Sequence, residues 1–295
     1  MTELAIIIVS YNTEKITRRC LINLKNNLKK YSISHEVVVV DNGSKDGSLI
    51  MLNNLVLNWK ELKVIASSRN LGFGKANNLG LSKTNSRYVL YLNSDAIVSD
   101  VDFRDLINVF KTQKNLGALT VKVLLSNGLI DPASHRGFPT LWRSFTYFFG
   151  LEKFFINIPI LNRLFGGYHL TNLNLNEIHE IDVPTGAFLL TKREVLKKIG
   201  GFDLSYFAYG EDIEMAWQIK SLGLKILYYP LWTVLHLKSM SGLKKNDEKI
   251  KKKTSFYFYD SMKIFYRKHY AKKNFWLINQ LVYLGIELKK YFDNR

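Results

Sequence analysis

The sequence contains one stretch in which a buried strand changes directly into polar side chains. Residues 88–92 are all apolar or aromatic and include no strand breaker, which is typical of a buried strand. Asn93, Ser94 and Asp95 follow at once. Open α/β sheets bind ligands at the carboxyl ends of their strands, and a carboxylate such as Asp95 offers the hard oxygen ligands that divalent cations prefer. An Asx turn that only ends the strand is the structural alternative.

Two more polar clusters stand directly after short apolar runs. They are Ser10, Tyr11 and Asn12 after the run 4–9, and Asp41, Asn42, Gly43 and Ser44 after the run 37–40. A carboxylate in this position, such as Asp41, can accept hydrogen bonds from a nucleobase or a ribose. A turn into a helix that is capped by Asp46 or Ser48 explains the same residues without a ligand.

A Gly-rich stretch, residues 70–80, leads into the third predicted helix. Glycines such as Gly74 allow the backbone to come close to a ligand, and the start of a helix favours phosphate. Asn70 and Asn77 add polar groups to the same stretch. Tight packing of the helix on the sheet accounts for the glycines equally well.

The elements between these clusters alternate in type. Strands are predicted at 4–9, 37–40, 62–66 and 88–92, and helices with apolar residues three or four positions apart at 16–28, 49–56 and 73–81. Strands that alternate with helices predict an α/β fold with a mostly parallel, Rossmann-like sheet flanked by helices. Right-handed crossovers place the carboxyl ends of such strands at one edge, so we expect the polar clusters to converge there.

The pattern is looser after Asp95. A helix is predicted at 102–110, a strand at 117–125, a strand at 183–190 with a turn at Gly186, a helix at 192–199 and a strand at 224–229 that ends at Pro230. Residues 138–168 are rich in aromatic and basic side chains. We expect a pair of core helices packed on the sheet there, and a flap on the acceptor side that leans on a membrane is the alternative.

A second cluster of carboxylates lies in the stretch 201–217. Glu211, Asp212 and Glu214 stand at a predicted helix start, where the helix dipole alone favours acids. The predicted buried face of this helix consists of Ile213, Ala216 and Trp217. That face leaves Glu211 and Asp212 at the rim, beside several aromatic residues. Carboxylates beside aromatic rings suit a sugar-binding wall and a general base.

Four of these motifs occur in an order and spacing that resemble a known family. They are Val9–Asn12, Asp41–Ser44, Asn70–Asn78 and Leu92–Asp95. Together with the Gly-Gly-Phe-Asp and Glu-Asp motifs of residues 200–212, they resemble the family 2 glycosyltransferases with the GT-A fold, and most of all the rhamnosyltransferase-like branch. Where the wider family has Asp-x-Asp, this sequence has Asn-Ser-Asp, so Asp95 is the one carboxylate left to bind a cation. The resemblance covers roughly residues 4–240.

The resemblance implies roles for individual residues. Binding of the nucleotide sugar is implied for Ser10, Tyr11, Asn12, Asp41, Ser44, Asn70, Gly74, Asn77, Asn93, Ser94, Asp95 and Gly186. A Mg²⁺ or Mn²⁺ ion is implied at Asp95 and at His236, which matches a family histidine after the last strand, although a lone histidine is most often structural. Asp212 is the implied general base, with Glu211 in reserve.

The implied reaction moves a sugar from a nucleoside diphosphate donor to an acceptor hydroxyl. One base without a carboxylate nucleophile predicts a single displacement and inversion at the anomeric carbon. The branch implies dTDP-rhamnose, and a UDP-hexose stays open as donor. The acceptor would be a glycan or a lipid-linked glycan of a bacterial cell surface. On this interpretation residues 1–240 form the GT-A domain, with a nucleotide-sugar half at 1–125 and an acceptor half at 126–240.

The chain has 295 residues and a net charge of +17, and the excess is concentrated near its end. Residues 238–273 hold twelve Lys or Arg against three acids, a net charge of +9, interleaved with aromatic residues. We predict a basic, aromatic, helical extension at 241–295, with a solvated loop at 244–253. Such a stretch suits an anionic membrane surface. A helix packed on the domain with a charged outer face is the alternative.

The sequence also bears on the compartment. Cys20 is the only cysteine, so no disulfide can form within the chain, which fits a reducing compartment. The first residues lack a basic leader, and no run reaches the roughly 18 apolar residues of a membrane span. We therefore expect a cytoplasmic protein, either free in the cytosol or peripheral on the cytoplasmic face of the inner membrane.

Two other classes of protein fit less well. A basic, aromatic protein could bind nucleic acid without catalysis. Carboxylates at the strand ends would repel a phosphate backbone, so we expect no nucleic-acid partner. A nucleotidyltransferase would need a basic, Gly-rich loop after the first strand, and the cluster that begins at Ser10 is not one.

Overall fold

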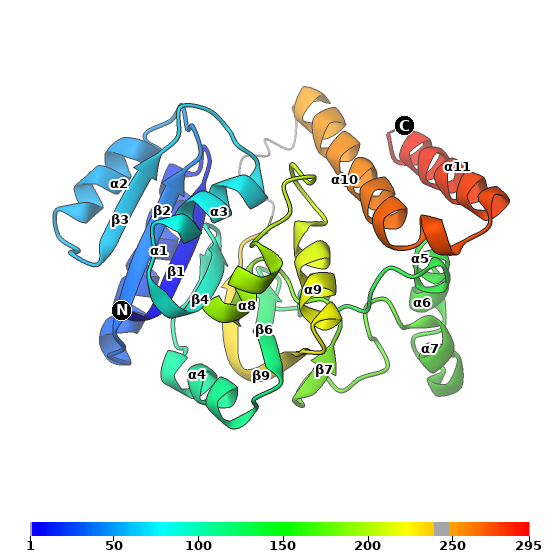
Figure 1. The fold of residues 1–295 in the computed structure, drawn as a ribbon, viewed down its shortest axis with the longest axis horizontal. Coiled ribbons are helices and arrows are strands. Elements are labelled where there is room, and N and C mark those ends of the chain that lie inside the picture. Colours follow the sequence, from blue (N-terminus) through cyan, green and yellow to red (C-terminus); the bar gives the residue numbers. More distant parts are fainter. Residues whose placement is uncertain (1, 239–247, 295) are drawn as a thin grey trace.

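The computed structural model describes residues 2–238 and 248–294 and shows an α/β fold (Figure 1). The strands are β1 (Thr2–Ser10), β2 (His35–Asp41), β3 (Leu62–Ala66), β4 (Ser86–Asn93), β5 (Ala96–Ile97), β6 (Leu116–Leu125), β7 (His179–Ile181), β8 (Phe188–Lys192) and β9 (Lys225–His236). In these residues they form one mixed sheet in the order β3-β2-β1-β4-β8-β6-β9-β5, with β7 paired to β9.

Helices cover both faces of this sheet, and further helices lie to one side of it (Figure 1). They are α1 (Glu14–Lys30), α2 (Ser48–Val56), α3 (Phe73–Ser82), α4 (Phe103–Thr112), α5 (Leu141–Phe148), α6 (Leu151–Phe154), α7 (Pro159–Phe165), α8 (Arg193–Ile199), α9 (Glu211–Ser221), α10 (Glu248–His269) and α11 (Trp276–Asp293). Two short 3-10 helices are η1 (Pro132–Ser134) and η2 (Ala271–Lys273). The first four predicted strands and three predicted helices are thus confirmed.

The first four strands pair in parallel and bring their polar ends together. Strand β1 lies between β2 and β4, with Ser10 opposite Asp41 and Val9 opposite Asn93. The expected convergence of the polar clusters is therefore confirmed. Strand β8 is antiparallel to both β4 and β6 and opens the mixed part of the sheet.

The strand residues alternate between two hydrophobic layers, which is why the parallel strands are apolar throughout. On one face Leu4, Ile6 and Ile8 pack with buried residues of α1, α2 and α4. On the other face Ile7, Val89 and Tyr91 pack with buried residues of α8 and α9. Helix α3 covers Val38 and Val40 on this second face. Both faces of the central strands are therefore closed to water, and polar groups collect at the strand ends.

Two predicted strand limits are wrong. Strand β9 does not end at Pro230 but continues to His236. Its pairing with β6 shifts between Tyr229 and Thr233, so the extra residues form an irregularity that accommodates a proline without a ladder hydrogen bond. The strand expected at 183–190 begins only at Phe188, and Val183 forms an isolated bridge with Arg136.

The aromatic segment 138–168 does not form the expected pair of core helices. It forms the short helices α5, α6 and α7, whose buried residues are the polar Thr146, Glu152 and Asn162. Phe149 and Phe154 are 70% and 77% exposed. Several of its aromatic rings contact one another, as in the pairs Trp142–Phe145 and Phe145–Phe149, whereas Phe138 packs against the core.

Helix α10 packs on α9, which agrees with the packed-helix alternative for the basic extension. Tyr259, Phe265 and Tyr266 are buried, and the Trp217 ring lies 5.6 Å from that of Phe265. The solvated loop predicted at 244–253 is wrong for residues 248–253, because α10 begins at Glu248, and residues 244–247 lie outside the described residues. Helix α11 folds back along α10, with the Tyr283 ring 5.7 Å from that of Tyr266.

A buried carboxylate fastens α10 to α9. Glu214 is 1% exposed and accepts hydrogen bonds from the Tyr206 hydroxyl at 3.0 Å and His269 Nε2 at 2.7 Å, with Lys268 Nζ at 3.2 Å. Burial alone would raise the pKa of Glu214, but the hydrogen bonds from His269 and Gln218 outweigh burial and lower the pKa to about 2. The ionised carboxylate therefore stabilises the folded state.

We expect Glu214→Gln to lower the free energy of unfolding by about 3 kcal/mol at pH 7, because it breaks a buried ion pair. A depressed pKa stabilises the fold above the unfolded-state value, and this stabilisation disappears as pH falls through the folded value. The difference between parent and variant should thus shrink between pH 4.5 and pH 2, roughly the two pKa values of Glu214. Denaturant unfolding at several pH values measures it. The exposed Glu194→Gln is the control, and an equal midpoint for Glu214→Gln and parent at pH 7 would contradict the expectation.

Candidate active site

The first two polar loops are fastened to each other at the sheet edge. Asn12 has a positive φ of 54°, and its backbone N–H donates to Ser44 Oγ at 2.9 Å. The Asn12 side chain accepts a hydrogen bond from the Lys45 N–H at 2.7 Å. Ser10 is fully buried, and its hydroxyl bonds to Thr13 and Thr17 of the neighbouring helix, whereas Tyr11 is exposed. The structure thus brings Ser10, Asn12 and Ser44 together, mainly as the frame of the loops.

Asp41 is a buried carboxylate with spare hydrogen-bonding capacity. It is 2% exposed, and its Oδ2 accepts a hydrogen bond from the Ser44 N–H at 3.2 Å. Its Oδ1 is buried and has no hydrogen-bond partner in the part of the chain that the structure describes. A buried acceptor without a partner is costly unless a ligand completes it. Asp41 therefore suits the donor hydrogen bonds of a nucleobase or a ribose.

The Gly-rich loop contacts both the loop after β2 and the segment before α9. Asn70 Oδ1 accepts from the Gly72 N–H at 2.9 Å and from the Asn42 side chain at 3.1 Å. Gly72 has a φ of +83°, and a Cβ there would lie 2.5 Å from the Phe207 carbonyl oxygen. The Phe73 N–H donates to the same carbonyl at 3.0 Å. Glycine is therefore required at position 72 for the two loops to meet.

Two residues predicted to bind the donor serve helix packing. Gly74 packs against Phe202, since a Cβ there would lie 3.1 Å from the Phe202 Cβ. Asn77 is 1% exposed and its amide donates to the Phe73 carbonyl at 3.0 Å. Gly186 is only partly buried, and the Ala187 carbonyl beside it accepts from the Asn93 N–H at 3.2 Å. The loop of Gly186 thus adjoins the end of β4.

Asp95 and His236 face each other at the end of β4. Strand β5 follows Asp95 directly and pairs with β9, with Ala96 opposite His236. This pairing places Asp95 Oδ1 3.2 Å from His236 Nε2. His236 Nδ1 lies 3.1 Å from Asp131 Oδ2, and Asp131 is fully buried. Lys238 Nζ completes the row at 3.0 Å from Asp131 Oδ1.

The charge of His236 is set by these two carboxylates. Burial lowers the pKa of His236, but the hydrogen bonds to Asp131 and Asp95 outweigh burial and raise the pKa to about 9. An imidazolium between two carboxylates compensates the cost of burying their charges. Asp131 and His236 are thereby fixed in one orientation, with Nε2 directed at Asp95.

These residues fit a divalent cation that shares its coordination with a substrate. Asp95 and His236 supply an oxygen and a nitrogen, and Asn93 Oδ1 beside them is buried without a partner among the described residues. No group of three or more His, Cys, Asp or Glu within residues 2–238 and 248–294 is arranged to enclose a metal. Mg²⁺ is commonly held by one or two carboxylates together with substrate phosphates, so an open site of this kind fits it.

The two carboxyl groups at the start of α9 have different environments. Asp212 Oδ2 accepts a hydrogen bond from Arg136 Nη2 at 2.6 Å. Arg136 also donates to the carbonyls of Ala133 and Pro184. Glu211 is buried, and its Oε2 has no partner in the described part of the chain. Burial and the neighbouring charge of Asp212 raise the pKa of Glu211 far above its ordinary value.

The predicted buried face of α9 needs correction. The buried residues are Glu211, Glu214, Met215, Ala216 and Ile219. Glu211 therefore does not lie at the rim as expected, and Ile213 and Trp217 are only partly buried. Trp217 instead packs against Phe138 of the aromatic segment 138–168, with ring centroids 4.8 Å apart. Asp212 is thus more accessible than Glu211, and the guanidinium group of Arg136 lies beside it.

Sequence analysis missed Asp131 and Arg136, which lie in one short segment. Asp131 contacts His236 from 105 positions away, and Arg136 contacts Asp212 from 76 positions away. Asp131 also caps η1 by accepting from the Ala133 N–H, and this cap is the only local signal that its sequence gives. The segment 131–136 connects the candidate cation residues to the candidate base.

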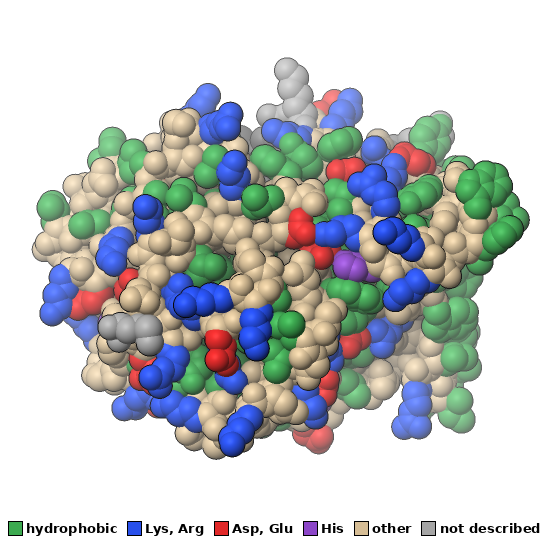
Figure 2. All heavy atoms as spheres, in the orientation of Figure 1, with side chains coloured by type: hydrophobic (Ala, Val, Ile, Leu, Met, Phe, Trp, Pro, Cys, Tyr) green, Lys and Arg blue, Asp and Glu red, His purple; other side chains and the backbone are tan. Residues whose placement is uncertain are grey.

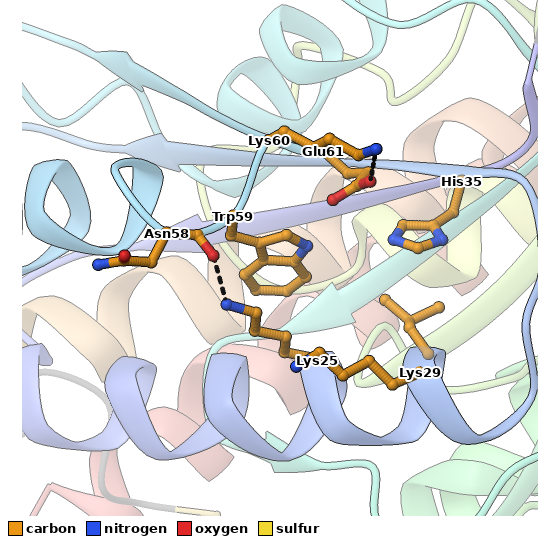
Figure 3. Close-up of a pocket in the computed structure, with 8 residues that line it drawn as sticks. Lys25, Lys29, His35, Asn58, Trp59, Lys60 and Glu61 are labelled. Carbon is orange, nitrogen blue, oxygen red and sulfur yellow. Dashed lines mark hydrogen bonds and ion pairs between the residues drawn. The ribbon is translucent and has the colours of Figure 1, made fainter.

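A cavity away from the polar loops has a volume of about 330 Å³. It is lined by residues at the start of β2 and β3 and on α1, including Lys25, His35 and Trp59 (Figure 3). Lys25 Nζ donates to the Asn58 carbonyl at 2.6 Å and lies over the Trp59 ring. This is the amino-terminal edge of the parallel strands, opposite the polar loops, so the cavity is not part of the candidate site.

Comparisons with known proteins show which family the chain resembles. The family model for glycosyl transferase family 2 matches residues 5–200. The chain is 24% identical to the rhamnosyltransferase WbbL of Escherichia coli over 78% of this chain and 82% of WbbL. It is 26% identical to the low-salt glycan biosynthesis hexosyltransferase Agl10 of Haloferax volcanii over 77% of this chain and 64% of that protein. It is 24% identical to the N-acetylglucosaminyl-diphospho-decaprenol L-rhamnosyltransferase of Mycobacterium tuberculosis over 70% of this chain and 67% of that protein.

Solved structures establish the predicted GT-A fold. The mannosyltransferase PcManGT from Pyrobaculum calidifontis, in complex with GDP-Man and Mn²⁺, matches with a TM-score of 0.60 at 16% identity, over 99% of this chain and 71% of that chain. GalNAc-T7 with UDP, GalNAc and Mn²⁺ matches with a TM-score of 0.61 at 15% identity, over 98% of this chain and 55% of that chain.

We expect Asp131→Asn to lower the pKa of His236 from about 9, because the imidazolium loses one of its two carboxylate partners. Since a raised histidine pKa stabilises the fold most below the unfolded value and less as pH rises through the folded value, the variant should lose most stability near pH 6. Titration of the imidazole ¹⁵N signals by NMR measures the pKa.

Asp105→Asn is the matched control for Asp131→Asn. Asp105 also bonds to β9, through Tyr229 and Trp232, but does not contact His236. It should leave the His236 titration unchanged. An unchanged His236 titration in Asp131→Asn would show that Asp131 does not set the charge of this histidine.

Proposed function

Because the chain belongs to glycosyl transferase family 2, we propose that it moves a sugar from a nucleoside diphosphate to an acceptor hydroxyl with inversion. One observation carries the proposal. The short segment 131–136 holds His236 beside Asp95 at one end and Arg136 beside Asp212 at the other. A candidate site for the diphosphate and a candidate base thus belong to one connected set of buried charges.

Asp212 is the proposed base. The acceptor hydroxyl must lose a proton as it attacks, and a base must be ionised to take it. Arg136 forms an ion pair with Asp212 Oδ2 at 2.6 Å, whereas burial raises the pKa of Glu211. Transfer by one base without a covalent intermediate leads to inversion, in contrast to the double displacement of retaining glycosidases.

Asp95 and His236 are the proposed ligands of Mg²⁺ or Mn²⁺. A bound cation would supply Lewis-acid stabilisation of the charge on the leaving diphosphate. His236 must give up its Nε2 proton to become a ligand, so cation binding here would release a proton. Asp41, with its free Oδ1, is proposed to bind the base or ribose. Further donor contacts are proposed for Tyr11, Asn12, Ser44, Asn70, Asn93, Ser94 and Gly186. Ser10, Gly74 and Asn77 would contribute by holding the loops of this site in place.

dTDP-rhamnose is the proposed donor, since two relatives of similar length are rhamnosyltransferases by name. A UDP-hexose is the second candidate, because a hexosyltransferase is also among the relatives. A glycan or lipid-linked glycan of a bacterial surface is the proposed acceptor, which agrees with the diphospho-decaprenol acceptor in the name of one relative. Residues 1–125 would bind the donor and residues 126–240 the acceptor.

We place the protein in the cytoplasm, in contact with an anionic membrane surface. Its net charge of +17 favours such a surface. In the described residues no helix is both long and apolar enough to cross a membrane. Contact with the bilayer would therefore be peripheral wherever these residues are involved.

Asp95→Asn should weaken metal-dependent donor binding while it preserves the fold. The amide keeps the size and a hydrogen-bond acceptor for His236 but removes the charge that a cation needs. We expect transfer to fall by about two orders of magnitude or more. Thermal-shift titration of dTDP and UDP with and without Mn²⁺ should give a smaller Mn²⁺-dependent increase in the midpoint than in the parent. The exposed Asp100→Asn should behave like the parent, and parental turnover of Asp95→Asn would refute the assignment.

Asp212→Asn should lower turnover by about a hundredfold or more, because the amide cannot accept a proton. Donor affinity should be preserved, since the change lies on the acceptor side of the reaction. Glu211→Gln is the matched comparison one position away and should lose much less activity. The reverse result, with full activity in Asp212→Asn and loss in Glu211→Gln, would transfer the role of base to Glu211.

A further inference from the structure

Helix α11 has two apolar sides, although only one of them packs on the protein. Its inner side faces α10, where Asn279 Oδ1 accepts from the Tyr266 hydroxyl at 2.7 Å and the Tyr283 ring contacts the Tyr266 ring. Every residue of α11 remains at least partly exposed. Packing on α10 therefore does not explain the hydrophobic residues of its other side.

The other side carries a regular apolar stripe. Its members are spaced by three, four or seven positions, which places them on one side of a helix. They are Leu277, Leu281, Leu284, Leu288 and Phe292, all exposed. Leu281 is 60% exposed and Phe292 is 64% exposed. A stripe of this spacing normally faces a protein core, but here it faces away from α10.

The outer segment 141–165 adds a second exposed apolar surface at the same end of the molecule. Trp142, Phe145 and Phe149 form a stripe along α5 and its end, and Ile160 of α7 is 83% exposed. A cleft lined by Tyr147, Phe258 and Asp293, among others, lies between α5, α10 and α11. Figure 1 shows α5–α7 and α11 at one end of the fold, and Figure 2 shows hydrophobic side chains gathered at that end.

The charges around this surface are positive or already neutralised. Lys272 and Lys273 directly precede α11, and Lys153 and Arg163 lie on α6 and α7, all exposed. The acids of α11 are paired, since Glu287 bonds to Lys263 and Asp293 bonds to Lys289. Trp276, beside the two lysines, is 67% exposed. Exposed aromatic rings beside lysines are typical of segments that lie in a membrane interface.

We propose that the apolar stripes of α11 and α5, with Ile160 of α7, form a docking face for an anionic lipid bilayer. A second copy of the chain is the other occupant that an apolar face could take. Two chains of charge +17 would repel each other, and their basic rims would meet, whereas anionic lipid attracts the same rims. The positive charge therefore favours an anionic bilayer over a second copy of the chain.

This inference deepens the proposed membrane contact by assigning it to one face. It also narrows the expectation that the basic, aromatic stretch 238–273 contacts an anionic membrane, because Tyr259, Phe265 and Tyr266 of that stretch are buried in the packing of α10. The chain just before α5 also contacts α9, since the Phe138 ring lies 4.8 Å from that of Trp217.

Flotation of the full chain with vesicles tests the proposal. We expect binding to phosphatidylglycerol/phosphatidylcholine vesicles that weakens at high salt, and little binding to pure phosphatidylcholine. The triple variant Leu281→Gln, Leu284→Gln and Leu288→Gln should bind about tenfold more weakly or worse, because it removes apolar groups from the bilayer. These positions are exposed, so the thermal midpoint should stay close to that of the parent.

Ile50→Gln with Leu57→Gln is the matched control. Both residues belong to α2 or its end, are 70% and 80% exposed, and lie at the opposite end of the molecule. This variant should bind vesicles like the parent. Brominated lipids should quench the tryptophan fluorescence of the parent and should quench a variant with Trp142→Phe and Trp276→Phe much less.

Several outcomes would overturn the proposal. They are parental vesicle binding by the triple variant, equal binding to neutral and anionic vesicles, and no binding at low salt. A parent that dimerises in sedimentation velocity, with a monomeric triple variant, would assign the stripe to a second copy. Vesicle binding needs no sugar transfer. Transfer to a water-soluble acceptor without vesicle binding would refute the docking face alone, and vesicle binding without turnover of any donor would refute the proposed function alone.

Discussion

The parallel pairing of β1 with β2 and β4 is the constraint on which the rest of the structure depends. It places Ser10 opposite Asp41 and Val9 opposite Asn93, so the loops that follow three strands must share one edge. Because apolar layers cover both faces of the sheet, the polar residues that follow these strands collect at that edge. Asp41 and Asn93 each retain a buried oxygen without a partner among the described residues. The same register that builds the core therefore leaves hydrogen-bonding capacity for a ligand.

The second half of the site depends on a different device. The segment 131–136 has little regular structure, yet Asp131 pairs with the buried His236 and Arg136 pairs with the partly buried Asp212, both on distant elements. Removing Asp131 would leave a buried ion with one partner fewer, which costs more than the loss of a surface pair. The segment thus couples the end of β9 to the start of α9. A substitution at one end of this segment should therefore alter the surroundings of the carboxylate at its other end.

Local pattern was sufficient wherever local packing decides the structure. The strands at 4–9 and 62–66 and the helix at 73–81 follow from apolar periodicity alone, because each buries its apolar face in a continuous layer. Asp131 and Arg136 could not be found in this way, since their partners are distant and a lone Asp before Pro132 has the pattern of an ordinary cap. The apolar residues of α11 and of the segment 138–168 do not by themselves show what covers them. Phe149 and Phe154 of that segment are exposed, whereas Phe138 packs on the core.

The distribution of charge bears on the need for a cation despite the missing first carboxylate of the tripeptide 93–95. The basic side chains beside the candidate carboxylates are already engaged, Lys238 with Asp131 and Arg136 with Asp212. His236 is likewise shared between Asp131 and Asp95. A departing diphosphate would gain negative charge next to these acids, and each of the three cations would have to leave a carboxylate partner to bind it. The divalent ion proposed at Asp95 would avoid this conflict, because it would bring new positive charge and would displace only the Nε2 proton. On this proposal a single carboxylate is sufficient when the diphosphate supplies further ligands.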